Sequence, residues 1–196
     1  MFSVKSILLA FAIAVSAPLA IVSEAAAQST VVVIDQGKIL RDSKAGQDIR
    51  TKLQAIQNQM QGELQPTATQ LQTEGDAIEA KTATMTPEAM RADAALKTEV
   101  ENYARKANDF NRRRQITGQE LQLTERAAYG QLLQALEPVL QEVFNEKGAN
   151  VMLDRSSIVF ADDGTDVTAL VISKLDASTP TIAVTRQKLP VQQPQQ

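Results

Sequence analysis

Apolar residues occur with two different spacings along this chain. Two short stretches rich in consecutive apolar residues, 31–34 and 151–160, are separated by a long stretch whose apolar positions recur at helical spacing. The first lies in TVVVID and is typical of a strand covered on both faces. The second is expected to form a hairpin, in which Val151–Asp154 and 158–160 flank a turn. The pattern therefore predicts a small sheet that a long helical arm leaves and rejoins.

The first half of the arm has the apolar spacing of a coiled-coil seam, three and four residues in alternation. This spacing joins Ile49, Leu53, Ile56 and Met60, and a strict seven-residue repeat then follows at Leu64, Leu71 and Ile78. Gly62, Pro66 and Gly75 interrupt the pattern, and a proline inside a helix removes a hydrogen bond. Two separate helices or one long kinked helix would both fit. We favour the kinked helix because the heptad spacing resumes beyond Pro66.

The chain is expected to turn back at 82–87, where Thr86 can cap a helix that starts with Pro87. This returning helix should run from about residue 88 to 147, up to a C-terminal cap at Gly148. Its seam is predicted to contain Leu96, Val100, Tyr103, Ala107, Phe110, Leu121, Ala128, Leu132, Leu136, Val139 and Val143.

After the second apolar stretch, Thr165 or Asp166 is expected to cap a short amphipathic helix over 167–175. The residues from Ala177 onward are rich in Pro, Thr and Gln, which predicts a disordered tail over 177–196. Residues 181–185 are an alternative candidate for an edge strand.

These elements predict an α+β fold with a β-rich oligomerisation body and a long antiparallel coiled-coil hairpin arm. The body comprises 28–42 and 148–176, and the arm comprises 43–147 with its tip near 82–87. Three short strands and one small helix are too little to be stable alone, and their edges would be unpaired. We therefore expect copies of the chain to close their strands into a shared β-barrel. The predicted oligomer interface contains Val31, Val33, Val151, Leu153, Ile158 and Phe160.

The N-terminus has the pattern of an export signal. Lys5 precedes an apolar run over 7–22, and the small residues 25–27 match a cleavage site. A membrane anchor is the alternative, but the run is shorter than the ~20 residues needed to span a bilayer. We expect residues 1–27 to be cleaved and the mature chain to be exported and soluble.

Composition argues against most kinds of chemistry. The chain has no histidine or cysteine, a formal net charge of −3 and a pI near 5.1. It therefore lacks the commonest general base and any thiol, and its acidity argues against nucleic-acid binding. Gly37 and Lys38 follow a strand but lack the rest of a phosphate-binding loop. Asp162, Asp163 and Asp166 lack the ligand spacing of a calcium loop, which favours turn and cap roles. We predict neither an enzyme nor a bound cofactor or metal.

The arm carries one basic cluster, formed by Arg105, Lys106, Arg112, Arg113 and Arg114. It is either a solvated face neutralised by nearby acids or a contact for an anionic partner. The methionines Met60, Met85 and Met90 lie along the arm and at its tip. Methionine repacks readily against varied partners, although Met60 also fits the seam.

Several short motifs, in this order, resemble the Skp/OmpH family of periplasmic chaperones. They are VVVID (31–35), IL (39–40), SKAG (43–46), LEPV (136–139), EKGANVMLD (146–154), IVF (158–160) and DVT (166–168). The resemblance covers residues 30–176. It implies a homotrimer with a small β-barrel body and three helical arms around a cavity.

The same resemblance implies function. Such a protein acts in the periplasm without ATP, where it binds unfolded outer-membrane proteins and prevents their aggregation before membrane insertion. Basic arm residues are implied to contact lipopolysaccharide or an anionic membrane surface. The candidate client-binding residues are Met60, Leu64, Leu71, Ile78, Met85, Met90 and Leu96. The alternative is a trimeric envelope structural or adaptor protein that binds one folded partner or a cell-wall component.

Overall fold

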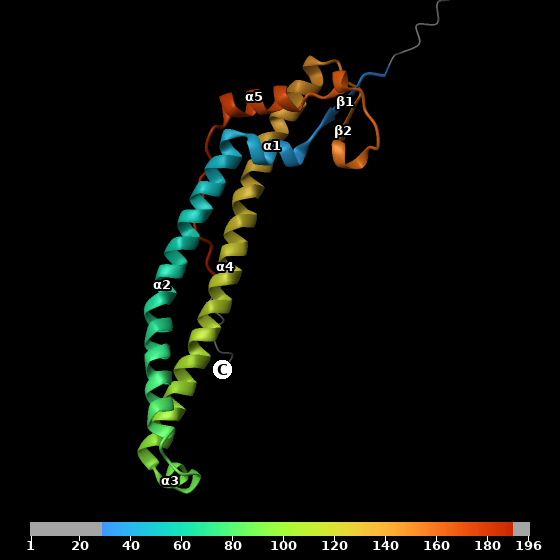
Figure 1. The fold of residues 1–196 in the computed structure, drawn as a ribbon. Helices are drawn as coiled ribbons and strands as arrows, with labels where there is room; N and C mark the ends of the chain where they lie inside the picture. The colour runs from blue at the N-terminus through green and yellow to red at the C-terminus, as the bar shows by residue number, and fades with distance from the viewer. Residues whose placement is uncertain (1–28, 190–196) are drawn as a thin grey trace, which may run out of the picture.

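The computed structural model describes residues 29–189, and the expected export signal lies outside them. Figure 1 shows a small body and a long curved arm. The arm consists of two long helices side by side, with a short helix at the tip. These are α2 (Lys44–Thr82), α4 (Ala94–Glu146) and α3 (Pro87–Ala92). The predicted helical hairpin is therefore present, and its coiled-coil winding stays a prediction.

The first arm helix is continuous. Pro66 lies inside α2, and the helix continues through Gly62 and Gly75 to Thr82. Pro66 is exposed, so its ring projects from the arm rather than into the contact with α4. The two-helix alternative for this segment is therefore wrong.

The arm tip contains one helix break that the sequence pattern did not predict. Thr86 caps α3 as expected, because its side chain accepts a hydrogen bond from the Ala89 N–H at 3.2 Å, and Pro87 starts the helix. However, the helix ends at Ala92, and Asp93 caps a new helix by accepting from the Leu96 N–H at 2.9 Å. A side-chain carboxylate that bonds a nearby amide favours a helix start, which explains why the return splits into α3 and α4.

The far end of α4 has the predicted glycine cap. Gly148 has a φ of 58° and directly follows the C-cap residue Lys147. The Ala149 N–H donates to the Phe144 carbonyl and the Gly148 N–H donates to the Asn145 carbonyl, at 3.0 and 3.1 Å. This is the Schellman arrangement, which directs the chain from the helix into the sheet.

The sheet has two parallel strands, β1 (Val31–Ile34) and β2 (Val151–Asp154), with Val31 opposite Val151. The predicted hairpin at 151–160 is wrong. The Asp154 carboxylate accepts from the Ser156 N–H at 2.8 Å and starts the 3₁₀ turn η1 (Arg155–Ser157). Residues 158–160 then leave the sheet. The whole arm acts as the crossover between the strands, which is why they pair in parallel.

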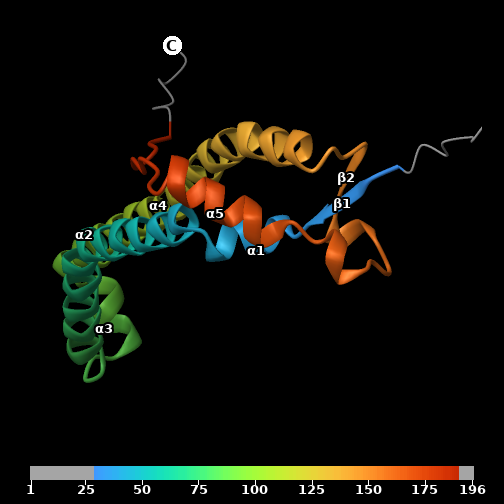
Figure 2. The ribbon, with the colours of Figure 1, turned by 90° about the horizontal axis from the view of Figure 1, so that it is seen from above.

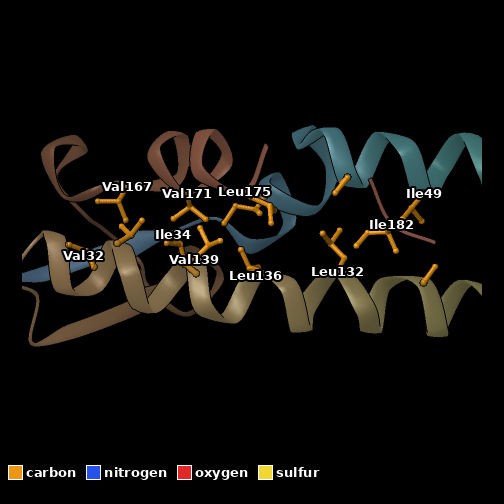
Figure 3. Close-up of a cluster of buried hydrophobic side chains, with 14 of the residues drawn as sticks. Val32, Ile34, Ile49, Leu132, Leu136, Val139, Val167, Val171, Leu175 and Ile182 are labelled. Carbon is orange, nitrogen blue, oxygen red and sulfur yellow. The ribbon is translucent and has the colours of Figure 1, made fainter. Parts of the chain in front are cut away.

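One apolar core joins the sheet, the upper arm and the last helix. It lies beside α1 (Gln36–Asp42) and α5 (Thr168–Ser178), and Figure 2 shows α5 extending along the body next to α1. Figure 3 shows side chains of all these parts meeting between α4 and α5. The buried residues drawn there include Val32, Ile34, Ile49, Leu132, Leu136, Val139, Val167, Val171, Leu175 and Ile182.

The segment after α5 does not fit the expectation of a disordered tail. From Thr179 to Leu189 it descends along α2 and α4 (Figure 1), with Ile182 in the core and Arg186 bonded to both helices. Every second side chain from Ile182 to Arg186 is at least half-buried, while those between are exposed. The Pro, Thr and Gln content concealed this alternation. We call residues 179–189 the strap. Residues 190–196 lie outside the described part.

Candidate functional site: surfaces of the arm and of the sheet

The candidate client-binding residues do not form one surface. Three of them, Met60, Leu71 and Leu96, are buried in the arm, and Met60 retains only 2% of its exposure. The remaining four are half-buried: Leu64, Ile78, Met85 and Met90. The buried three hold the arm together, so in this structure only the half-buried four can offer apolar surface to a ligand.

The arm exposes apolar residues that the heptad pattern did not predict. Val100 was expected in the seam but is 42% exposed, and Ile116 is also exposed. Leu96, Tyr103 and Phe110, each seven residues apart, are at least half-buried, which leaves Val100 on the flank of the helix. Val100 lines a shallow depression together with Ile78 and Tyr103. Val100 lies four residues after Leu96 and three before Tyr103, so it stands outside this seven-residue series, and that was the available signal.

Ion pairs partly neutralise the basic cluster. Lys106 Nζ lies 2.6 Å from Glu74 Oε1 on the opposite helix, and this hydrogen bond lowers the pKa of the Glu74 carboxyl. Arg112 pairs with Asp109 at 3.0 Å. All five basic side chains of the cluster are exposed. The acids therefore balance part of the charge and leave the cluster accessible to solvent.

Two of the remaining cations of the cluster, Arg113 and Arg114, lie near the Phe110 ring. The Arg114 guanidinium is 5.9 Å from the centre of the Phe110 ring, and Arg105 bonds Asn102. Arg113 lines a shallow depression with Gln70 and Phe110, between α2 and α4. Within the described residues Arg105, Arg113 and Arg114 form no ion pair, so all three are free to meet an anion.

The sheet carries a second exposed apolar surface. Val31, Val151 and Leu153 lie on the face away from the core, and each is more than a third exposed. Beyond β2, Phe160 is 94% exposed and Val159 is 87% exposed, although Val159 was not among the predicted interface residues. Two other residues of the predicted interface are less available: Val33 is buried within the chain and Ile158 is half-buried.

Asp162 caps η2 (Asp163–Thr165), but the predicted cap of the last helix by Thr165 or Asp166 is wrong, because α5 has Val167 at its N-cap and no side-chain cap. Asp162 accepts from the Gly164 N–H and Asp166 accepts from the Thr168 N–H, both at 2.8 Å. In residues 29–189, no group of three or more potential ligands is placed to hold a metal ion. No helix in this part of the chain is both long enough and apolar enough to cross a membrane.

The family and the fold of this chain are shown by a family model and by a solved structure. The family model described as outer membrane protein (OmpH-like) matches residues 30–175, which is most of the chain. The chain belongs to the OmpH-like family. Within this chaperone family, a proposed OmpH-like outer membrane chaperone from Caulobacter crescentus CB15 has a similar crystal structure, with a TM-score of 0.71 and 27% sequence identity. The match covers 82% of this chain and 92% of that one.

None of the curated proteins compared with the chain matched it. The OmpH-like match includes the sheet, both long arm helices and nearly all of α5. It ends at Leu175, before the strap. The strap contacts are therefore features of this chain that the OmpH-like family model does not describe.

Proposed function

We propose that this chain is an ATP-independent periplasmic holdase, which binds unfolded outer-membrane proteins and prevents their aggregation before membrane insertion. The observation that carries the proposal is the long arm of a chaperone-family member, whose accessible apolar residues are scattered over a polar surface. Ile78 and Val100 share one shallow depression, whereas Ile116 is exposed elsewhere on α4, so the accessible apolar surface is divided into small parts. Such a surface suits many weak contacts with different unfolded chains better than one specific ligand.

The energetics of scattered contacts favour this mode of binding. Each buried Val or Ile side chain contributes only about 1.5–3 kcal/mol, so a single contact exchanges rapidly. Several arms acting on one client would raise the overall affinity through effective concentration, while each local contact stays weak. Such a complex holds a client and still releases it without ATP.

Several arms require several copies, and the exposed sheet face supports a homotrimer with a shared β-barrel. Parallel β1 and β2 form too small a sheet to be stable alone, and its outer face is apolar. Val159 and Phe160 follow β2 in the chain, are almost fully exposed and would be shielded from water in an assembly. The interface we propose therefore comprises Val31, Val151, Leu153, Val159 and Phe160.

The basic cluster would contact anionic partners, which include lipopolysaccharide, an anionic membrane surface and acidic stretches of a client. Arg113 and Arg114 are exposed and form no ion pair within residues 29–189. Exposed cations attract anions over about a Debye length, roughly 8–10 Å at physiological salt. This contribution should therefore decrease as salt is added, whereas the apolar contacts should not.

The test is an aggregation assay. Purified mature protein should slow aggregation of an unfolded outer-membrane β-barrel protein diluted from urea into low-salt buffer. A variant with Arg112, Arg113 and Arg114 changed to Gln should retain suppression at high salt and lose part of it at low salt. The matched control changes Arg50, Arg91 and Arg126 to Gln, which removes the same charge from exposed positions elsewhere.

Two outcomes would count against the proposal. The holdase function is wrong if the wild-type chain leaves aggregation unchanged at every ratio. Capture of one folded envelope partner at fixed stoichiometry, without any protection of unfolded clients, would support the adaptor alternative. Equal effects of the two triple variants would show that the basic cluster has no special role, and would leave the holdase function untouched.

A further inference from the structure

The strap makes an unusual set of contacts, because most of its polar partners bind its main chain. At its upper end the Ile182 N–H donates to Asp48 Oδ2 at 3.0 Å, and the Ile182 carbonyl accepts from Lys52 Nζ at 2.7 Å. Both partners lie on α2. Asp48 and Lys52 also pair with each other at 2.6 Å, so each is held in place for the strap.

The lower end is bound in the same way by α4. The Gln187 N–H donates to Thr124 Oγ1 at 2.9 Å, and the Leu189 N–H donates to Glu120 Oε1 at 3.4 Å. Thr124 and Glu120 are both buried. The Thr124 hydroxyl donates in turn to the Glu120 carbonyl at 2.7 Å. A buried polar side chain needs a partner, and here the strap backbone supplies it.

Only one charged strap side chain is bound by both helices. Arg186 reaches Glu63 on α2 and Glu120 on α4, each at 2.8 Å, and this bridges the two helices. Two apolar side chains precede it at alternate positions, with Ile182 buried and Val184 half-buried. Lys188, next along the same face, is exposed and forms no ion pair among the described residues.

Five arm residues therefore form what we call the strap track: Asp48, Lys52, Glu63, Glu120 and Thr124. The strap track binds a segment with three features. The backbone is extended, two apolar side chains lie two positions apart, and a cation follows two positions further on. Contacts to main-chain N–H and C=O groups are available to any extended polypeptide, and alternate side chains add preference.

We propose that the strap track is a binding surface for extended segments of other polypeptides, and that the strap occupies it as an intramolecular competitor. The biological role of the track rests on the proposed holdase function. The partner is an extended, unfolded segment with alternating apolar residues followed by Arg or Lys. The acidic track disfavours segments that carry Asp or Glu at the position of Arg186.

Covalent attachment to the same chain explains why the strap would regulate binding to the track. A segment attached through a short linker acts at an effective concentration in the mM range. A free peptide at μM concentration cannot displace it from the wild-type chain, whereas a weakened strap can be displaced. Occupancy of the track therefore depends on the strength of the Arg186 contacts.

The experiment uses a fluorescent peptide with the sequence of residues 179–189 and the full-length chain. Arg186→Glu places a like charge against Glu63 and Glu120 and should release the strap. The peptide should then bind at least about tenfold more tightly than to the wild type, a difference of 1.4 kcal/mol. Lys188→Glu is the matched control and should bind the peptide as weakly as the wild type. A peptide with Glu in place of its arginine should not bind.

A second variant tests the same claim by locking the strap reversibly. The chain contains no cysteine, so Thr124→Cys with Gln187→Cys provides a single pair that can be oxidised to lock the strap. Combined with Arg186→Glu, the oxidised form should lose peptide binding and the reduced form should regain it. Circular dichroism confirms that each variant keeps its helices.

The result separates this inference from the proposed function. Absence of peptide binding to both the Arg186→Glu and the reduced double-cysteine chain would overturn the strap-track inference, even if aggregation suppression were normal. Equal binding to the oxidised and reduced forms would overturn it too. Strap-dependent peptide binding without any aggregation suppression would support the track and overturn the holdase function.

Discussion

At the residue scale, the junction between α1 and α2 depends on a glycine. A Cβ at Gly46 would lie 1.9 Å from the Leu40 carbonyl oxygen, and the Ser43 hydroxyl accepts from the Gly46 N–H at 3.1 Å. Ser43 is fully buried and caps α2. The chain can therefore leave the body and enter the arm only if this position has no side chain.

We predict that Gly46→Ala destabilises the protein, because the new methyl group would meet main-chain atoms that cannot rotate away. The cost should be about 1–3 kcal/mol or more, as for overpacked cores. Gly62→Ala is the control, because nothing lies within 4 Å of its Cβ position on the exposed face of α2. It should stabilise the chain by about 0.5–1 kcal/mol. Urea unfolding followed by circular dichroism measures both, and equal midpoints would contradict the prediction.

A second residue-scale prediction concerns acid release of the strap. The hydrogen bond from Lys52, together with the Ile182 N–H, lowers the pKa of Asp48, and the Arg186 hydrogen bond lowers the pKa of Glu63. A carboxyl whose pKa is lowered in the folded state stabilises the folded state at pH values above the ordinary carboxyl pKa of about 4. This stabilisation is lost as the pH falls through the lowered pKa. The strap should therefore stay bound at neutral pH and detach below about pH 4.

The measurement is a pH titration of backbone amide resonances by NMR. The Ile182 and Gln187 signals should move together toward disordered positions at acidic pH, ahead of global unfolding. The Ala149 amide, which bonds the Phe144 carbonyl, serves as the internal reference. Strap signals that change only with global unfolding would contradict the prediction.

At the element scale, α4 belongs to two environments. Its C-terminal half supplies the core with Leu132, Leu136 and Val139, whereas its N-terminal half buries only isolated residues such as Leu96. The arm should therefore open locally at much lower free energy than the body.

We predict that Leu132→Ala costs about 2–5 kcal/mol, because Leu132 is fully buried and its removal leaves a cavity. Leu133→Ala is the matched control, since the neighbouring leucine is 40% exposed, and it should cost clearly less. Thermal unfolding by calorimetry gives both values. Similar losses at the two positions would show that the C-terminal half of α4 does not pack as described.

The elements also show which features could be predicted from sequence. The hairpin arm, the Thr86 cap and the Gly148 cap follow from local patterns of three to seven residues. The parallel pairing of β1 with β2 could not be predicted in this way. Residues 155–157 have the composition of a hairpin turn, and only the structure shows that Asp154 bonds Ser156 and starts a 3₁₀ turn. The strap was missed because its alternation of Ile182, Val184 and Arg186 spans too few residues to outweigh its polar composition.

The candidate site was harder to predict than the fold. Heptad positions identify which residues can face the other helix, and therefore Met60 and Leu71 were chosen as binding residues although the hairpin buries them. What remains accessible depends on the rotation of α4 relative to α2, as Val100 shows. That rotation is set by tertiary packing and is not contained in the spacing.

At the scale of the whole molecule, a single copy leaves its most apolar surface uncovered. The outer face of the sheet and the segment after β2 place Val31, Val151 and Phe160 in water, while the core lies on the opposite face. Exposed apolar residues gathered in the body are typical of contact surfaces. Their position at the body, far from α3 at the arm tip (Figure 1), would leave the arms free in an assembly.

We therefore predict that Phe160→Asp dissociates the assembly. An aspartate in a shared apolar interface would lose its hydration without gaining a partner, which costs several kcal/mol per copy. Analytical ultracentrifugation of the wild type should give the mass of three chains, and the variant should shift toward one. Val100→Asp is the control, because Val100 is an exposed apolar residue of the arm and its change should leave the mass unaltered.

Dissociation of the assembly would separate the three arms. Phe160→Asp should therefore also weaken aggregation suppression more than Val100→Asp does, although the arm surface of the Phe160→Asp chain is intact. A wild type with the mass of a single chain would contradict the shared barrel, and strong suppression by that single chain would show that avidity is not needed.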